Sequence, residues 1–196
     1  PRYRSSAASD VYKRQAGTRN LDEVAIVQQL VEALGPRVTP WKDEPVVRPS
    51  SFWNHQLAVV SPHRAQNVAL RKAMHEAGRG DACVVETVDR IQGRERDSII
   101  MSYTVSDPEF ALVEAAFLFS VQRFNVALTR ARSKFIMVLS RALLEVVPTE
   151  EEVFDQARLL REFVFECQEA GTVTIPGHNG RGLEVSIRLR GFNADT

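Results

Sequence analysis

Four short runs of apolar residues recur along the chain, and they limit the folds that it can adopt. The runs cover residues 57–62, 84–88, 98–105 and 135–140. Each has the length of a buried strand rather than that of a helix. Segments with helical periodicity lie between the first and second runs and between the third and fourth. Short apolar strands that alternate with helices favour a mostly parallel sheet covered on both faces, so the sequence predicts an α/β fold.

Three segments before the last strand have the apolar spacing of an amphipathic helix. The first begins at Asn20, which has capping-box spacing with Glu23, and its apolar residues recur at helical intervals as far as Leu34. The other two cover residues 64–77 and 117–132. These helices would supply the two layers that a parallel sheet requires.

Composition divides the chain into three parts. Residues 1–16 lack periodicity, and their stretch SSAASDVYKRQ resembles translated adaptor sequence, so we expect this segment to be extraneous or disordered. Residues 17–147 form the predicted α/β domain, with a proline-rich connection at 36–56. Residues 148–196 are predicted to form an appendage, in which an acidic helix ends at Gly171 and a β-hairpin follows.

Charge and cysteine content exclude several classes of protein. Lysine plus arginine (25) equals aspartate plus glutamate (25), so net charge does not indicate a nucleic-acid-binding protein, although a balanced total can hide a local basic face. The two cysteines and four histidines have no metal-ligand spacing, so we expect no metal ligands in the chain. No apolar run approaches the ~18 residues of a membrane span, and we expect a cytoplasmic protein without a membrane partner.

Polar residues follow the first three predicted strands, where an α/β sheet usually binds its ligands. The longest such segment, ETVDRIQGRERD at residues 86–97, places one glycine among charged residues. Gly93 would allow a ligand to approach the backbone, and a neighbouring carboxylate would accept hydrogen bonds from ribose hydroxyls. The alternative is a solvated turn with local ion pairs.

Arginines line one side of the predicted helix at 117–132. Arg123 and Arg130 are seven residues apart, so they project together from the side opposite the apolar stripe. Two guanidinium groups on one face suit a polyphosphate or a nucleic-acid backbone. Arg132 is expected nearer the apolar stripe, at the helix C-terminus, where a cation favours the helix dipole. The alternative is an exposed face with solubilising arginines.

Several nucleotide-binding motifs are absent from the sequence. No lysine follows a glycine, so a Walker A motif (GxxxxGK[ST]) cannot occur, and neither Asp-Glu pair follows an apolar strand as a Walker B carboxylate does. The chain also lacks GxGxxG and GxSxG. By itself, the chain is therefore not expected to cradle and activate an ATP phosphate.

Three segments together resemble motifs of superfamily 1 helicases, in the branch of the nonsense-mediated-decay helicase and the nuclease-helicases of replication. LAVVSPHRAQ at 57–66 resembles motif IV, VETVDRIQGRERDSIIMSY at 85–103 resembles motif V, and RFNVALTRARSKFIMVLS at 123–140 resembles motif VI. Their order and spacing also agree with that family, over roughly residues 18–145. The resemblance implies a RecA-like three-layer fold, to which the pattern of residues 148–196 adds a C-terminal helix and hairpin appendage.

The resemblance also implies roles for residues that would bind a nucleotide. Arg130 would act as an arginine finger on the γ-phosphate of ATP with Mg²⁺, bound mainly by a first RecA-like domain outside this chain. Arg64 would be a second phosphate contact, and Arg123 shares the arginine face. Glu95 would bind the ribose, Gly93 would allow close approach and Gln92 would sense the nucleotide; these six candidates are Arg64, Gln92, Gly93, Glu95, Arg123 and Arg130.

For nucleic acid, the resemblance places Ser61, Thr87 and Asp89 toward a single strand of DNA or RNA. The chain would then be the C-terminal motor domain of a helicase or translocase, a fragment of a longer protein that is inactive alone. The alternative is a stand-alone module that uses its arginine face to hold nucleic acid or a subunit without ATP hydrolysis. An unrelated nucleotide-binding α/β enzyme is a third reading, which the absence of a visible catalytic nucleophile disfavours.

Overall fold

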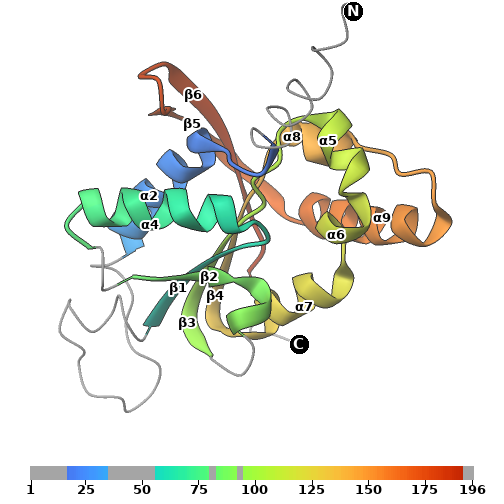
Figure 1. The fold of residues 1–196 in the computed structure, drawn as a ribbon, viewed down its shortest axis with the longest axis horizontal. Helices are drawn as coiled ribbons and strands as arrows, with labels where there is room; N and C mark the ends of the chain where they lie inside the picture. Colours follow the sequence, from blue (N-terminus) through green and yellow to red (C-terminus); the bar gives the residue numbers. More distant parts are fainter. Residues whose placement is uncertain (1–16, 35–55, 80–82, 92–94, 192–196) are drawn as a thin grey trace, which may run out of the picture.

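A computed structural model describes residues 17–34, 56–79, 83–91 and 95–191 of the chain (Figure 1). Its centre is a four-stranded sheet in the order β2-β1-β3-β4, in which every neighbouring pair is parallel. The strands are β1 (Leu57–Ser61), β2 (Val84–Thr87), β3 (Arg96–Ser102) and β4 (Ala131–Val138). This sheet, with helices packed on it, confirms the predicted α/β fold of the RecA-like type.

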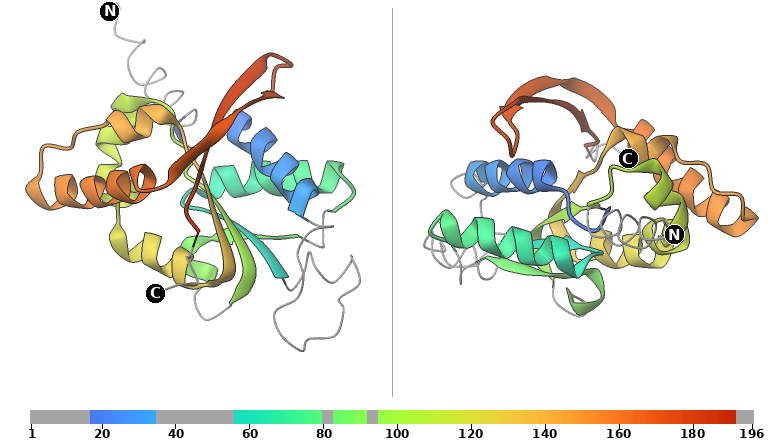
Figure 2. Two further views of the ribbon diagram at one scale, coloured as in Figure 1. Left: turned by 180° about the vertical axis from the view of Figure 1, so that it is seen from behind. Right: turned by 45° about the horizontal axis from the view of Figure 1, so that its top comes forward.

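Helices form a layer on each side of the sheet (Figure 2). On one face, α2 (Leu21–Leu34) and α4 (Arg64–Glu76) pack against Leu57, Val59 and Ile100. The opposite face is covered by six helical elements: η2 (Val88–Ile91), α5 (Pro108–Val113), α6 (Ala115–Leu118), α7 (Val121–Thr129), α8 (Arg141–Glu145) and α9 (Glu151–Phe165). Because successive strand residues point to opposite faces, a strand buried on both sides must be apolar throughout.

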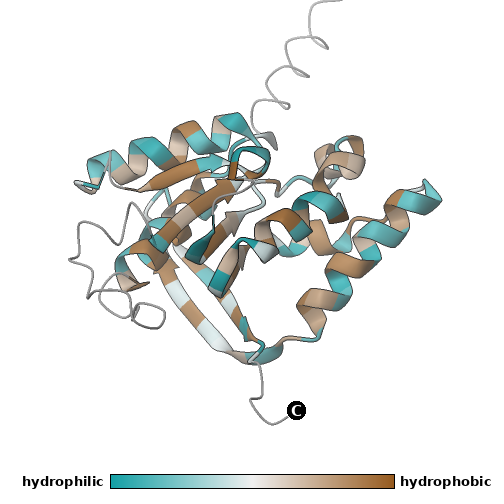
Figure 3. Cartoon of the chain, turned by 90° about the horizontal axis from the view of Figure 1, so that it is seen from below, coloured by the Kyte–Doolittle hydropathy of each residue, from teal (hydrophilic) through white to brown (hydrophobic). Residues whose placement is uncertain are grey.

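Each layer is apolar only where it faces the sheet. In α4, Leu70 is fully buried whereas Val68 is 63% exposed. Figure 3 shows the covering helices with hydrophilic and hydrophobic residues in alternation. In the described part of the chain, no helix has the length and apolar content needed to cross a membrane.

The predicted helix at 117–132 is interrupted and shorter than the sequence suggested. It divides into α6 and α7, α7 ends at Thr129, and β4 begins at Ala131 instead of residue 135. Arg132 therefore lies in a strand, and its expected place at a helix C-terminus is wrong. The reason is pairing with β3: Arg96 and Ala131 are partners, and the Arg96 N–H donates to the Arg130 carbonyl at 2.9 Å. Strand pairing has overridden a sequence with good helix propensity.

The C-terminal part contains the expected helix and hairpin, but with a different boundary. Helix α9 ends at Phe165, and Gly171 lies inside strand β5 (Gln168–Pro176), which pairs with β6 (Gly182–Leu189). The hairpin arches away from the body in Figure 2 and returns at its tip, where the His178 N–H donates to Asp22 Oδ1 at 3.0 Å. By contrast, α9 buries Val153, Ala157 and Leu160 in the same cluster as the sheet. By its packing α9 belongs with the sheet, and the hairpin is the part that stands apart.

Truncation of a buried α4 side chain should reveal how much this layer contributes to stability. We expect Leu70→Ala to lower the free energy of unfolding by about 2–5 kcal/mol, because it removes buried methyl groups and leaves a cavity. Val68→Ala on the exposed side of α4 is the matched control and should change it by less than about 0.5 kcal/mol. Urea unfolding of both variants would measure this, and equal effects would show that α4 does not pack as described.

Candidate functional site

The parallel sheet divides the predicted site residues between its two ends. Ser61 and Thr87 are register partners at the carboxyl ends of β1 and β2. Glu95 and Arg130 immediately precede β3 and β4, so they lie at the amino ends of those strands. The seven residues of β3 span roughly 20 Å at about 3.3 Å per residue. Glu95, which was expected beyond the carboxyl end of the second strand, therefore lies at the amino end of β3.

Arg64 does not share a site with Arg130 in this structure. It is exposed as the first residue of α4, which follows the carboxyl end of β1. Arg130 follows α7 on the opposite face and lies at the amino end of β4. Their placement does not support a shared phosphate contact for these two arginines.

At the amino end, Arg132 connects two acidic residues that flank the start of β3. Its Nε donates to Glu95 Oε2 at 3.2 Å, and its Nη1 lies 3.9 Å from Asp97 Oδ1. Asp97 is 2% exposed, whereas about half of the Glu95 side chain is accessible. Glu95, the predicted ribose-binding residue, is thus held by Arg132, for which the sequence predicted no contact with a ligand.

Arg130 differs from its two neighbouring arginines in having no acidic partner within the described residues. It is the C-cap of α7, and its backbone is held by the bond from Arg96. Its side chain is partly buried, and its Nε is enclosed without a hydrogen-bond acceptor in the described structure. A guanidinium carries five fixed donors and remains charged, so this group can still bind an external anion.

Arg123, at the other end of α7, is already engaged. Its Nε lies 3.5 Å from Asp89 Oδ1, and its guanidinium lies 4.3 Å from the Phe117 ring centroid. The helix rises about 1.5 Å per residue, so about 10 Å along its axis separates Arg123 from Arg130. The structure therefore brings Arg123 together with Asp89, a predicted nucleic-acid residue, rather than with Arg130.

Two predicted residues, Gln92 and Gly93, lie outside the described residues. Thr87 is half-buried at the end of β2, and Asp89 is exposed in η2. Ser61 is fully buried, and its Oγ lies 2.8 Å from Thr104 Oγ1 and accepts the His63 N–H at 3.3 Å. A direct contact with a nucleic-acid phosphate would require an accessible Ser61 hydroxyl, and in this structure it is not accessible.

A buried polar network at the carboxyl end of the sheet was not foreseen from the sequence. Glu23 Oε2 accepts bonds from Ser102 Oγ at 2.6 Å and from the Thr104 N–H at 2.8 Å. Gln66 Nε2 donates to Ser102 Oγ at 2.9 Å, and Gln66 Oε1 accepts the Asn20 N–H at 2.9 Å. The network therefore joins α2, α4 and the end of β3.

The predicted capping box is only half formed because Glu23 belongs to this network. Asn20 Oδ1 accepts the backbone N–H groups of Asp22 and Glu23 at 3.1 Å, as an N-cap should. The Asn20 N–H, which a capping box would bond to Glu23, is instead bonded to Gln66. The spacing of Asn20 and Glu23 offered no signal of a contact with a strand about 80 residues later.

Burial shifts the pKa of two residues in or near this network. Desolvation raises the pKa of Glu23 from 4.5 to about 7, although the bonds from Ser102 and Thr104 act in the opposite direction. Burial lowers the pKa of His63 from 6.5 to about 4.

Thr104 has a φ of 76°, a left-handed conformation that is uncommon outside glycine. Its bonds to Glu23 and Ser61 hold this residue in that conformation.

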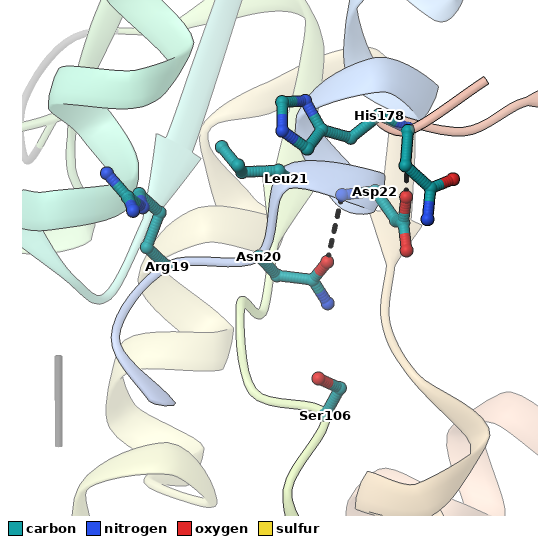
Figure 4. A pocket seen from close by; sticks show the side chains of 7 residues that line it. Arg19, Asn20, Leu21, Asp22, Ser106 and His178 are labelled. Carbon is teal, nitrogen blue, oxygen red and sulfur yellow. Dashed lines mark hydrogen bonds between the residues drawn. The ribbon is translucent and has the colours of Figure 1, made fainter. Parts of the chain in front are cut away.

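A shallow pocket of about 280 Å³ lies beside the network, between the start of α2 and the hairpin tip (Figure 4). Its lining comes from three segments far apart in sequence: Arg19, Asn20, Leu21, Asp22, Ser106, His178 and Asn179. None of these is a predicted site residue. Among the described residues no group of three His, Cys, Asp or Glu side chains could hold a metal ion.

The Glu23 carboxylate should make folding stability depend on pH. Because its pKa is raised in the folded state, folding takes up a proton between about pH 4.5 and pH 7. The contribution of Glu23 to the free energy of unfolding should thus fall by about 3 kcal/mol as pH rises through this window. Glu23→Gln should remove this fall, as measured by urea unfolding at several pH values.

Comparison with a matched variant isolates Glu23 from other titrating groups. The pKa of His63 is lowered, so its contribution to the free energy of unfolding rises between about pH 4 and pH 6.5, opposite to that of Glu23. The pH dependence of the wild type alone therefore does not separate the two residues. Glu32→Gln on the exposed side of α2 is the control and should retain the wild-type curve. If Glu23→Gln retained it as well, the carboxylate would not be buried as described.

Known proteins similar to this chain include several helicases. A family model for an AAA domain matches residues 4–142. The chain is 34% identical over 119 residues to DNA polymerase alpha-associated DNA helicase A of Saccharomyces cerevisiae, which covers 61% of the chain and 15% of that protein. It is 28% identical over 134 residues to DNA replication ATP-dependent helicase/nuclease JHS1 of Arabidopsis thaliana, covering 68% of the chain and 9% of that protein.

A human protein is also similar to the chain. Probable helicase senataxin of Homo sapiens is 30% identical over 128 residues, covering 64% of the chain and 4% of that protein. The chain thus spans between 4% and 15% of the length of these three relatives. The family match extends over most of the chain and includes all of the sheet. The chain therefore belongs to this AAA domain family, and its similarity to helicases places it in the superfamily 1 helicases.

Proposed function

We propose that this chain is the second RecA-like motor domain of an ATP-dependent DNA or RNA helicase or translocase. In this proposal Arg130 reaches the γ-phosphate of ATP bound by a first RecA-like domain. The observation that carries it is the state of Arg130, whose charged side chain is partly buried without an acidic partner in the described structure. The helicase names of the relatives support the same conclusion.

The environment of Arg130 suits a residue that receives its partner from outside the domain. Arg123 and Arg132 each have a carboxylate within 4 Å, so the segment is not generally short of acidic groups. A guanidinium that is partly withdrawn from water gains from an anion with matching geometry, and phosphate oxygens provide that geometry. In a phosphoryl-transfer site such a donor stabilises the charge that develops in the transition state.

The chain's own residues would hold the sugar and the phosphate of the nucleotide. Glu95 has one oxygen bonded to Arg132, and its other oxygen can accept from a ribose hydroxyl. Gln92 and Gly93 precede Glu95 and remain predicted to sense the nucleotide and to permit its close approach. ATP with Mg²⁺ supplies the phosphoryl group and the metal charge when bound. Because the chain has no Walker A lysine, most of that binding is assigned to the first domain.

A connection between the two ends of the sheet would couple ATP to nucleic acid. Thr87 ends β2 and Asp89 follows in η2, at the carboxyl end of the strand, where we propose that single-stranded DNA or RNA passes. Asp89 pairs with Arg123 near the start of α7, and Arg130 is the C-cap that follows the last residue of α7. Movement of η2 on binding of nucleic acid would therefore be transmitted along a short helix to the arginine finger.

Removal of the Arg130 guanidinium should abolish stimulated ATP hydrolysis. In the polypeptide that joins this chain to its Walker A domain, we expect Arg130→Ala to lower nucleic-acid-stimulated turnover by about 10³- to 10⁵-fold. Arg130→Lys should remain strongly impaired, because lysine keeps the charge but lacks the planar fork. Steady-state ATPase assays measure both, and thermal unfolding should be close to that of the wild type.

The control for this experiment is Arg158→Ala, which removes an exposed, ion-paired arginine on α9 and should leave turnover unchanged. Near wild-type turnover in Arg130→Ala would refute the arginine-finger assignment. A stand-alone binding module would give a different pattern, in which Arg130→Ala weakens binding to single-stranded nucleic acid and no ATP hydrolysis occurs. Measuring both activities on the same variants separates the two functions.

A further inference from the structure

Arg132 forms a bridge between an accessible carboxylate and a buried one. It donates through Nε to Glu95 Oε2 at 3.2 Å, and its Nη1 is 3.9 Å from Asp97 Oδ1. Asp97 is 2% exposed and belongs to the folded interior, whereas Glu95 lies at the surface beside Arg130. The bridge therefore ties a surface carboxylate to a fixed point of the fold.

An irregularity in the sheet directs Arg132 toward these two residues. Arg96 pairs with Ala131, but Ser98 pairs with Lys134, so β4 contains one residue more than β3 over this stretch. An extra residue of this kind bends a strand and re-aims its side chains, and it occurs often beside functional sites. Glu95, just before β3, and Asp97, within it, are two positions apart, and both carboxylates lie within 4 Å of the Arg132 guanidinium.

We propose that Arg132 is a positioning residue that orients Glu95 for a ribose hydroxyl; this rests on the proposed nucleotide site. Arg132 occupies Oε2 and leaves Oε1 as the acceptor for the sugar. The pair is half exposed, and such pairs contribute little to stability, so orientation is the role that the geometry supports. A carboxylate already held in one rotamer loses less freedom when the nucleotide binds.

Comparison of two nucleotides tests this role directly. The polypeptide with both RecA-like domains would be titrated calorimetrically with ATP and with 2′,3′-dideoxyATP, each with Mg²⁺. The wild type should bind ATP more tightly, because the analogue has no hydroxyl for Glu95. Arg132→Ala should reduce this preference by about two- to tenfold while leaving the affinity for the analogue unchanged.

A double-mutant cycle shows whether Arg132 acts through Glu95. In a Glu95→Ala background, Arg132→Ala should not change the preference for ATP any further. Arg132→Lys keeps a positive charge beside Asp97 and guards against misfolding of the alanine variant. It should fold like the wild type in thermal unfolding and still lose part of the preference, because lysine lacks the Nε–H that holds Oε2.

Each other outcome overturns a defined part of the proposal. Equal weakening of both nucleotides by Arg132→Ala and Arg132→Lys would make Arg132 a phosphate ligand and refute the positioning role. An unchanged preference in both variants would also refute it. A wild type that binds the two nucleotides equally would remove the ribose role of Glu95 but not the arginine finger. A wild type that binds no ATP would refute the proposed function itself.

Discussion

The parallel pairing of β3 with β4 is the constraint on which the rest of the site depends. The bond from the Arg96 N–H to the Arg130 carbonyl ends α7 and starts the β4 pairing at the same place. It places Glu95 and Arg130 side by side, although 35 residues separate them in sequence. The same pairing, through its extra residue in β4, brings Arg132 to Glu95 and Asp97. With a weaker pairing, the side chains of Glu95, Asp97, Arg130 and Arg132 would not be held close to one another.

The sheet also separates the two proposed ligands by its own length. The nucleotide-binding candidates Glu95 and Arg130 lie at the amino ends of β3 and β4, whereas the nucleic-acid candidates lie at the carboxyl ends of β1 and β2. Helix α7 and segment η2 cross this distance on one face and are joined by the Arg123 and Asp89 pair. Coupling between ATP and nucleic acid, as proposed, would require a stiff connection between the two sites. Packed elements of this kind transmit small movements.

At the carboxyl end, the buried network around Glu23 performs a different task. It links α2, α4 and the end of β3 through bonds at Ser102 and Thr104 that are buried and a bond from Asn20 to Gln66 that is partly buried. A buried carboxylate is costly, and so is the left-handed conformation of Thr104. The hydrogen bond from the Thr104 N–H to Glu23 Oε2 joins the two residues and fixes the path of the chain as it leaves β3. The burial of Ser61 follows from the same arrangement, because its hydroxyl is bonded to Thr104.

Sequence alone determined the strands, the main helices and the absence of a Walker A motif, because periodicity and motif spacing are local properties. It also separated Arg130 from Arg132 by helical geometry, but the fold overturns that premise, because Arg132 lies in β4 and Arg130 caps α7. Only tertiary structure decided the end of the sheet at which each residue lies, the early start of β4 and the burial of Glu23. These depend on pairings between residues far apart in the chain, and strands that are apolar on both faces lack the alternation that would indicate their register.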